Sequence, residues 1–343
     1  MLTTLDTLPA GFFEASPTTL HEILPGPTLI TLEGKRPQPL FVSVLLHGNE
    51  TVGFEAIQRV LAKTTYGSGI GPLPRSMSLF IGNSQAAAKG LRQLPGQPDF
   101  NRIWPGGVET GTPEQKACTE VFKIMEQRRP FASVDVHNTS GMNPHYAAVN
   151  KLDAAPLHLA SFFSRTVVYF RLPKGAQSLA FSEICPSVTV ECGKAGDQSG
   201  VDHAEEFLSA CLHLSKLPHH DVAPRDINLF HTVGRVTVDK ATTFGFGSEK
   251  VDLRFVDHLD QYNFTELPSG TILGRVNGNG KPPIAVCNES GDDVTDDYFL
   301  VEGGLLKTRT GVMPSMLTKD LTIIREDCLC YVMERYPFGI EGQ

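Results

Sequence analysis

The sequence contains no long apolar run, no excess of basic residues and no C-x-x-C cysteine pair. No run of about 18 apolar residues occurs, so we expect no membrane-spanning helix. The first segment, MLTTLDTLPAGFFEASPTTL, has neither a basic start nor a sustained apolar core and does not resemble a secretory signal. The 38 acidic residues outnumber the 30 basic ones. This argues against a nucleic-acid partner, because binding phosphates requires a basic surface.

The seven cysteines are scattered and form no C-x-x-C motif. This usage is typical of reduced thiols in a cytoplasmic protein, and a cysteine-based zinc site is not expected. The chain has 343 residues, of which 41% are hydrophobic and 20% charged, as in folded globular proteins. This length suggests two domains, and we expect them to cover residues 1–224 and 225–343.

The stretch FVSVLLHGNETVGFEAIQR, residues 41–59, is the most informative part of the chain. Its apolar start predicts a buried parallel strand with His47 at its carboxyl end. Apolar residues then recur at helical spacing, which places Glu50 in or just before the first helical turn. Gly48 permits a tight turn, and an imidazole and a carboxylate three residues apart can bind one zinc ion. The residues alone also fit a strand-end histidine followed by a glutamate that the helix dipole favours.

Two further predicted strands end in polar residues. Residues 131–136 form one strand, after which His137 emerges on the same side as Asp135. This pair fits a metal ligand with its orienting carboxylate, or a histidine that simply hydrogen-bonds to an acidic neighbour. Residues 186–190 form the other strand, with Glu191 at its carboxyl end. Because open α/β sheets bind ligands beyond the carboxyl ends of their strands, these polar residues are expected to lie at one site.

The other segments predict the surroundings of this site. Strands are expected at residues 27–32 and 78–81, and helices near Thr112 and near a capping pair of Asp202 and Glu205. From about residue 225 onward, helical periodicity nearly vanishes. The later part predicts a small all-β domain with strands at residues 234–238, 271–276, 284–287 and 321–324.

With the motifs HGNE, DFNR, DVHN and VECG, the chain resembles the succinylglutamate desuccinylase and aspartoacylase branch of the zinc carboxypeptidase superfamily. The resemblance covers nearly the whole chain. It implies an α/β fold with a zinc-carboxypeptidase-like mixed sheet flanked by helices. It also implies a smaller C-terminal all-β domain that covers the active-site cleft, and one zinc ion per chain.

The resemblance implies roles for single residues. His47, Glu50 and His137 match the zinc ligands of the family. Glu191 matches its catalytic glutamate, and Arg92 lies where the family has an arginine near the scissile carbonyl.

Residues for substrate binding are also implied. Asn101 and Arg102, preceded by the acidic Asp99, match the pair that grips the substrate carboxylate. Asn138 and Tyr298 are further candidates for contact with the substrate. The sequence ECGKA looks closest to the desuccinylase branch, whereas DVHNTSG resembles the aspartoacylase branch, so the exact substrate stays open.

We therefore expect a cytoplasmic zinc amidohydrolase that cleaves an N-acyl amino acid into a carboxylic acid and a free amino acid. Its partner would be this small substrate, without nucleic acid or membrane, and homo-oligomer formation is left open. A metallocarboxypeptidase acting on peptide C-termini is an alternative, because the same ligands and arginine serve both reactions. A non-catalytic, metal-dependent binding protein is another, although it would not need Glu191.

Overall fold

The computed structural model describes residues 1–66, 69–247, 250–277 and 280–337, and the chain divides into two compact units. Unit 1 contains Met1–Asn138 and His145–Asn228, and unit 2 contains Thr139–Pro144 and the chain from Leu229 onward. The predicted boundary at residue 224 and the covering role of the second domain stay predictions. Within the described residues, no helix is both long and apolar enough to cross a membrane.

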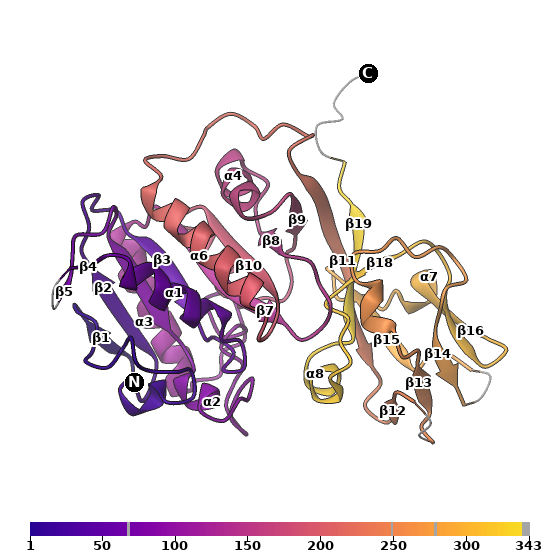
Figure 1. The fold of residues 1–343 in the computed structure, drawn as a ribbon. Coiled ribbons are helices and arrows are strands. Elements are labelled where there is room, and N and C mark those ends of the chain that lie inside the picture. Colours follow the sequence, from indigo (N-terminus) through magenta and orange to yellow (C-terminus); the bar gives the residue numbers. More distant parts are fainter. Residues whose placement is uncertain (67–68, 248–249, 278–279, 338–343) are drawn as a thin grey trace. The chain divides into compact units, whose positions relative to one another are not determined.

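Unit 1 is built on a mixed sheet whose strands follow the order β1-β2-β6-β3-β7-β10-β8-β9 (Figure 1). β3 pairs in parallel with both β6 and β7, whereas β2 pairs antiparallel with β6. The strands are β1 Thr3–Leu5, β2 Thr28–Leu32, β3 Leu40–Val44, β6 Met77–Ile81, β7 Ala132–Thr139, β8 Tyr146–Val149, β9 Thr166–Tyr169 and β10 Ser187–Lys194, beside a separate pair of β4 Thr65–Tyr66 and β5 Gly69–Ile70.

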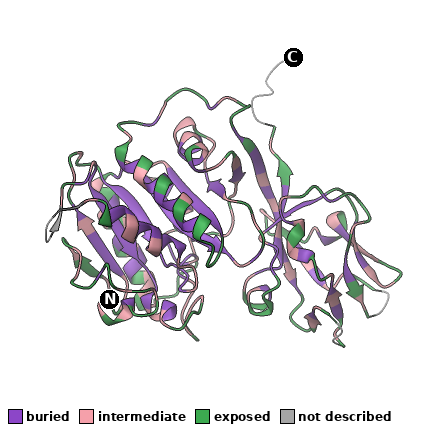
Figure 2. Cartoon of the chain, viewed as in Figure 1, coloured by how far each residue is buried: buried purple, intermediate pink, exposed green. Residues whose placement is uncertain are grey.

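Helices cover both faces of this sheet. On one face, a Cβ atom on Gly53 of α1 would meet the side chains of Val44 and Val136, so α1 packs closely onto β3 and β7. On the other face, Phe41 of β3 stacks on Phe181 of α5 with ring centroids 4.3 Å apart. The helices are η1 Leu20–Glu22, α1 Val52–Ala62, α2 Ser84–Ala87, α3 Pro113–Arg128, α4 Ala154–Phe163, α5 Gln177–Phe181 and α6 Gln198–His213. The central strands are consequently buried along their length (Figure 2), as their apolar sequences predict.

Unit 2 is rich in short strands. Within this unit, β11 pairs with β15 and with β19, and β19 pairs with β18. A separate five-stranded sheet has the order β12-β13-β14-β17-β16. Its elements are β11 Asn228–Val238, β12 Phe244–Gly245, β13 Leu253–Phe255, η2 Leu259–Tyr262, β14 Ile272–Val276, β15 Ile284–Asn288, α7 Thr295–Tyr298, β16 Phe299–Glu302, β17 Leu305–Thr308, β18 Met313–Ser315, α8 Leu321–Glu326 and β19 Cys330–Arg335. Buried side chains such as Val236, Leu253 and Leu306 form its core.

Two local predictions are wrong. The apolar segment 321–324 is not a strand but the start of α8, because Asp320 caps that helix by accepting hydrogen bonds from the backbone nitrogens of Thr322 and Ile323. The helix expected to begin at Asp202 begins at Gln198 instead.

Asp197 is the residue that caps this helix, α6, through the backbone nitrogen of Ser199. Asp202 and Glu205 lie inside α6. Asp202 forms an ion pair with Arg59 of α1, and Glu205 forms one with Lys63, the residue directly after α1. Elsewhere the predicted fold class holds, with a mixed sheet flanked by helices and a C-terminal β-rich region.

Candidate metal centre and active site

The turn that carries His47 and Glu50 begins beyond the end of β3. Leu45 follows the strand with φ of +54°, in the left-handed region that residues with a side chain rarely occupy. Such strained positions cluster at functional sites. Gly48 is needed for close approach, because a Cβ atom there would lie 2.3 Å from the backbone nitrogen of Ala87. The turn is therefore held tightly against α2.

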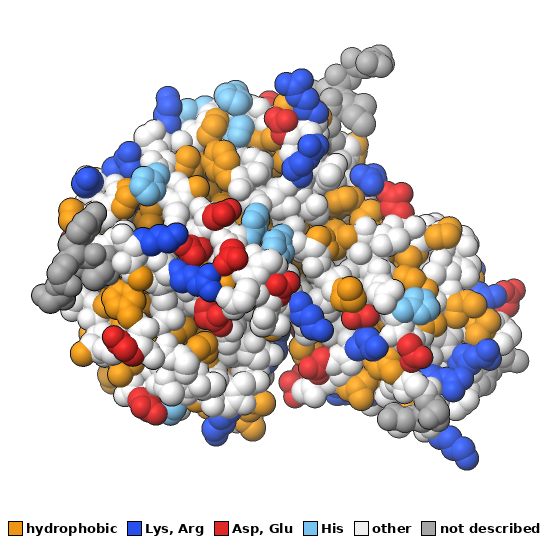
Figure 3. Space-filling model, in the orientation of Figure 1, with side chains coloured by type: hydrophobic (Ala, Val, Ile, Leu, Met, Phe, Trp, Pro, Cys, Tyr) orange, Lys and Arg blue, Asp and Glu red, His pale blue; other side chains and the backbone are white. Residues whose placement is uncertain are grey.

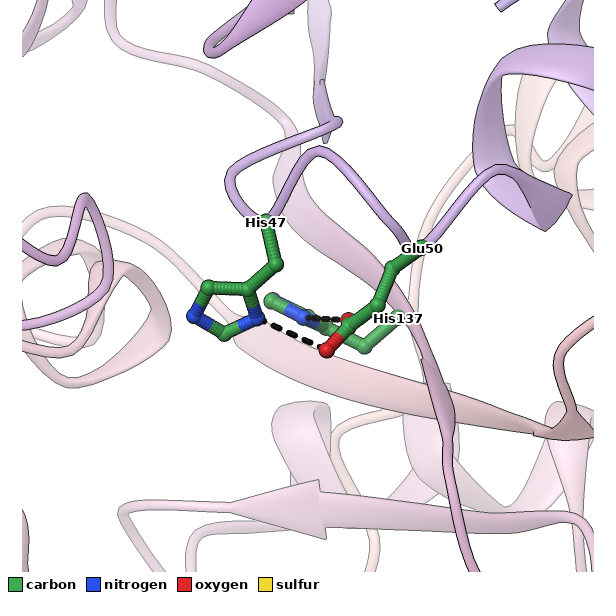
Figure 4. A group of neighbouring side chains, drawn as sticks. All are labelled: His47, Glu50 and His137. Carbon is green, nitrogen blue, oxygen red and sulfur yellow. Dashed lines mark hydrogen bonds and ion pairs between the residues drawn. The ribbon is translucent and has the colours of Figure 1, made fainter. Parts of the chain in front are cut away.

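His47, Glu50 and His137 point toward one another (Figure 4). Nδ1 of His47 lies 2.8 Å from Oε1 of Glu50, and Nδ1 of His137 lies 2.6 Å from Oε2. The ligand atoms of the three residues all lie within 4.8 Å of one another, and both imidazoles are buried. Two imidazoles and one carboxylate form a donor set that suits zinc. These three residues could therefore hold a metal ion.

The second nitrogen of each histidine contacts a carboxylate. Nε2 of His47 lies 3.0 Å from Oδ1 of Asp99, and Nε2 of His137 lies 2.8 Å from Oδ2 of Asp135. The hydroxyl of Ser43 donates to Oδ1 of Asp135 at 2.6 Å. Metal-binding histidines usually make such outer contacts, because these fix the ring and leave the other nitrogen for the metal. The arrangement fits a divalent cation.

Charges are concentrated around the two histidines. Burial alone would raise the pKa of Glu50, but His47 and His137 hold it well below its usual range. Burial would lower the pKa of His137, yet Asp135 and Glu50 hold it well above its usual value. Figure 3 shows acidic, basic and histidine side chains close together on one face of unit 1. A cation at Glu50 would be stabilised by the negative charge of Glu50 and of the nearby Asp99 and Asp135.

Glu191 lies on β10, the neighbour of β7 in the sheet. The residue is only 7% exposed, and its Oε2 atom has no hydrogen-bond partner among the described residues. Burial raises the pKa of its carboxyl to about 8, and the Glu50 charge adds to the rise whereas His137 opposes it. A buried carboxyl with a raised pKa beside candidate metal ligands has the properties of an acid–base residue.

The profile of the succinylglutamate desuccinylase/aspartoacylase catalytic domain matches residues 38–216, just over half of the chain. The chain belongs to this family. Among its relatives, the succinylglutamate desuccinylase of Pseudomonas aeruginosa is 32% identical over 134 residues, which is 38% of this chain and 37% of that protein. The match thus spans little more than a third of the length of this curated relative.

Two solved structures share the fold. The succinylglutamate desuccinylase from Chromobacterium violaceum has a TM-score of 0.55 at 18% identity, covering 88% of this chain and 86% of that one. Murine aminoacylase 3 has a TM-score of 0.56 at 14% identity, covering 88% of this chain and 96% of that one. The predicted zinc-carboxypeptidase-like fold class is confirmed by this likeness, which at such identities concerns the fold alone.

Arg92, the arginine expected near the scissile carbonyl, lies beside the candidate ligands. Its Nε and Nη2 atoms donate to Oδ2 of Asp99 at 3.2 and 2.9 Å, and its Nη1 lies 3.7 Å from Oε1 of Glu50. Burial would raise the pKa of Asp99, but Arg92 and His47 hold it well below its usual range. Asp99 thus joins Arg92 to His47, while the catalytic role of Arg92 stays a prediction.

Asn101 and Arg102 follow Asp99 in an irregular segment. The backbone nitrogen of Asn101 donates to Oδ1 of Asp99 at 2.7 Å, and its side-chain Nδ2 lies 3.3 Å from Nε2 of His137. Nη1 of Arg102 donates to the carbonyl of Asn101 at 2.9 Å. The structure therefore places Asn101 against a candidate ligand and Arg102 directly after it. Their binding of a substrate carboxylate stays a prediction.

Asn138 connects β7 to the start of α1. Its Oδ1 accepts a hydrogen bond from the backbone nitrogen of Val52 at 3.3 Å, and its own backbone nitrogen donates to Oε2 of Glu50 at 3.4 Å. Asn138 therefore helps to hold the turn that carries Glu50. Contact with the substrate stays a prediction for this residue.

Tyr298 belongs to unit 2 and ends α7. Its phenol hydrogen-bonds to Glu334, and burial together with the Glu334 charge raises the pKa of Tyr298. Its predicted contact with the substrate stays a prediction.

Ser43 is a member of this network that the sequence did not indicate. It pairs with Asp135 in the parallel register of β3 and β7. The only signal was a hydroxyl inside the apolar run FVSVLL, and a serine within a strand does not reveal which side chain it contacts. The register of the two strands and the hydrogen bond between the side chains show that Ser43 and Asp135 are neighbours.

Proposed function

We propose that this protein is a zinc-dependent hydrolase that cleaves the amide bond of an N-acyl amino acid. The observation that carries the proposal is the cluster of His47, Glu50 and His137, with both imidazoles buried, together with Glu191. The Oε2 atom of Glu191 is buried and has no hydrogen-bond partner among the described residues. Family membership supports the same reaction. A binding protein would need the cluster but would have no use for a buried carboxyl with an unsatisfied oxygen nearby.

The roles of the residues follow from their chemistry. His47, Glu50 and His137 would hold the zinc ion, which supplies a Lewis acid and lowers the pKa of a bound water to about 7. Glu191 takes a proton from the attacking water and returns it to the leaving nitrogen. Arg92 donates to the carbonyl oxygen as negative charge develops there.

Substrate binding is assigned to the segment after Arg92. The planar guanidinium of Arg102 can bind a carboxylate at two points, which lysine cannot reproduce. Asn101 and Asn138 offer amide groups, and Tyr298 is the candidate from unit 2. Because the curated relatives are named succinylglutamate desuccinylases, we propose N-succinyl amino acids as the first substrates to test. The seven cysteines all lie in the described residues and none forms a disulfide, which supports a cytoplasmic location.

The test is the release of free amine from N-succinyl, N-acetyl and N-formyl amino acids and from short peptides, with bound metal measured in the same sample. Selective turnover of one acylated amino acid would establish the amidohydrolase and identify its substrate. Cleavage of peptides alone would indicate a carboxypeptidase. Bound zinc without turnover of any compound would indicate a binding protein and reject the proposal.

A further inference from the structure

We propose that residues 175–178, which we call the strap, position Asn101 and Arg102 for binding of the substrate carboxylate. The strap follows β9 along the chain and includes the first two residues of α5, and none of its residues was indicated by the sequence motifs. The inference rests on the proposed role of Arg102. It adds a positioning element that acts through the residues it holds and does not itself contact the substrate.

The segment that carries Asn101 and Arg102 depends on its neighbours for its shape. Residues 99–107 form only turns and bends, without a helix or strand of their own. The backbone nitrogen of Trp104 donates to the carbonyl of Gly175 at 3.1 Å, and that of Gln177 donates to Oδ1 of Asn101 at 2.7 Å. The second bond occupies the amide oxygen of Asn101 and so fixes which end of this amide faces His137.

Two glycines enclose the peptide group of Arg102. A Cβ atom on Gly175 would lie 2.1 Å from the carbonyl oxygen of Arg102, and a Cβ atom on Gly107 would lie 2.3 Å from the same atom. Real Cβ atoms do not approach an oxygen so closely, so a side chain at either position must change how the glycine backbone lies against that of Arg102. Gly175 also has φ of +80°, which favours glycine. The strap therefore determines where the backbone of Arg102 lies.

The other end of the strap contacts two strands of the site. Gln177 is fully buried, and its Nε2 donates to the hydroxyl of Ser133 on β7 at 2.8 Å. The next residue, Ser178, accepts a hydrogen bond from the hydroxyl of Thr189 on β10 at 2.7 Å. β7 carries a candidate metal ligand and β10 carries Glu191. The strap thus ties the arginine segment to both strands.

The test compares Gly175→Ala and Gly107→Ala with Gly106→Ala. Gly106 is a matched control, because it has φ of +91° in the same segment but no atom within 4 Å of an added Cβ. Gly107 lacks a left-handed φ, so Gly107→Ala tests the contact with Arg102 without that backbone strain. Each zinc-loaded variant is assayed on an N-acyl amino acid and on the same compound with its carboxylate converted to an amide.

We expect Gly175→Ala and Gly107→Ala to raise KM for the carboxylate substrate by about tenfold or more, because small displacements of a binding group greatly weaken its action. Bound zinc and kcat should change little, and the amide analogue should show no such rise in KM. Hydrogen exchange of the amides in residues 99–107 should become faster in these two variants and not in Gly106→Ala.

If Gly175→Ala and Gly107→Ala match Gly106→Ala in both exchange and KM, the proposal is rejected. It is also rejected if exchange rises but KM for the two substrates changes equally. Absence of turnover in the wild type would reject the proposed function instead. In that case, unchanged hydrogen exchange in Gly175→Ala and Gly107→Ala would still reject the positioning role of the strap. Faster exchange confined to residues 99–107 in these variants would support that role.

Discussion

Oδ2 of Asp135 lies 2.8 Å from Nε2 of His137, two residues further along the same strand, and both side chains are almost completely buried. The contact leaves Nδ1 of His137 facing Glu50. Because Asp135 is held in turn by Ser43, the orientation of a candidate metal ligand is set by residues inside the sheet.

Asp135→Asn should weaken zinc binding by about 10- to 100-fold, since loss of an outer carboxylate frees the imidazole ring and lowers its basicity. Ser43→Ala should also weaken zinc binding, but by less, because Asp135 would remain beside His137. Competition with a chromogenic chelator measures both affinities. Equal zinc affinity in Asp135→Asn and the wild type would show that Asp135 does not orient a metal ligand.

Glu191→Gln should retain one zinc ion per chain and lose at least about 100-fold in kcat, because the amide cannot transfer the proton. The substitution preserves shape and removes the acid–base group. Metal analysis and single-turnover kinetics on the same preparation measure the two properties. Near-normal turnover in this variant would remove Glu191 as the base.

Arg102→Lys should lower kcat/KM for a substrate with a free carboxylate by about tenfold or more, because lysine cannot make the two-point contact. The same variant should act almost normally on the corresponding amide or ester. Parallel kinetics with the two compounds provide the measurement. If both compounds suffered equally, Arg102 would have a structural role and not bind the carboxylate.

We expect His145 to make folding stability depend on pH. Burial and the nearby His203 lower the pKa of His145, against the charge of Asp197, so the folded state binds this proton less well than the unfolded chain. Stability contributed by neutral His145 is therefore present above about pH 6.5, the value of an unperturbed histidine, and is lost as the pH falls below it. His145→Phe should show a smaller loss of stability between about pH 7.5 and 5.5.

Urea unfolding midpoints at several pH values measure this difference. His219→Asn, at an exposed position, serves as the control and should keep the pH dependence of the wild type. A wild-type pH dependence that survives unchanged in His145→Phe would assign the effect to other groups.

The sequence predicted the central strands and the meeting of their polar residues because short-range signals were clear. The apolar run before His47 and the helical spacing after Glu50 predicted β3 and α1, and the motifs predicted which residues converge. Segment 321–324 misled because its apolar pattern is too short to distinguish a strand from a helix. The segment forms the start of α8, and Asp320 caps this helix.

Other features depend on contacts between segments that are distant in the sequence. The spacing of residues along the chain does not predict such contacts. The sequence indicated Gly48 only as a turn residue. The structure shows that glycine is required there because the backbone of α2 lies too close for a Cβ atom. The contact of Ser43 with Asp135 follows from the register of β3 with β7 and could not be predicted from the sequence. Likewise, Gln177 and Ser178 gave no signal, because their hydrogen bonds go to Ser133 and Thr189 on separate strands.

We propose that His47, Glu50 and His137 hold the zinc ion on which hydrolysis depends. The most direct test of this proposal is to add zinc stepwise to metal-free protein and measure amine release from an N-succinyl amino acid at each step. We predict that activity rises in proportion to zinc up to one equivalent per chain, and that His137→Ala shows no such rise. Turnover that is equal with and without zinc, or that survives in His137→Ala, would show that hydrolysis does not depend on a zinc ion held by these residues.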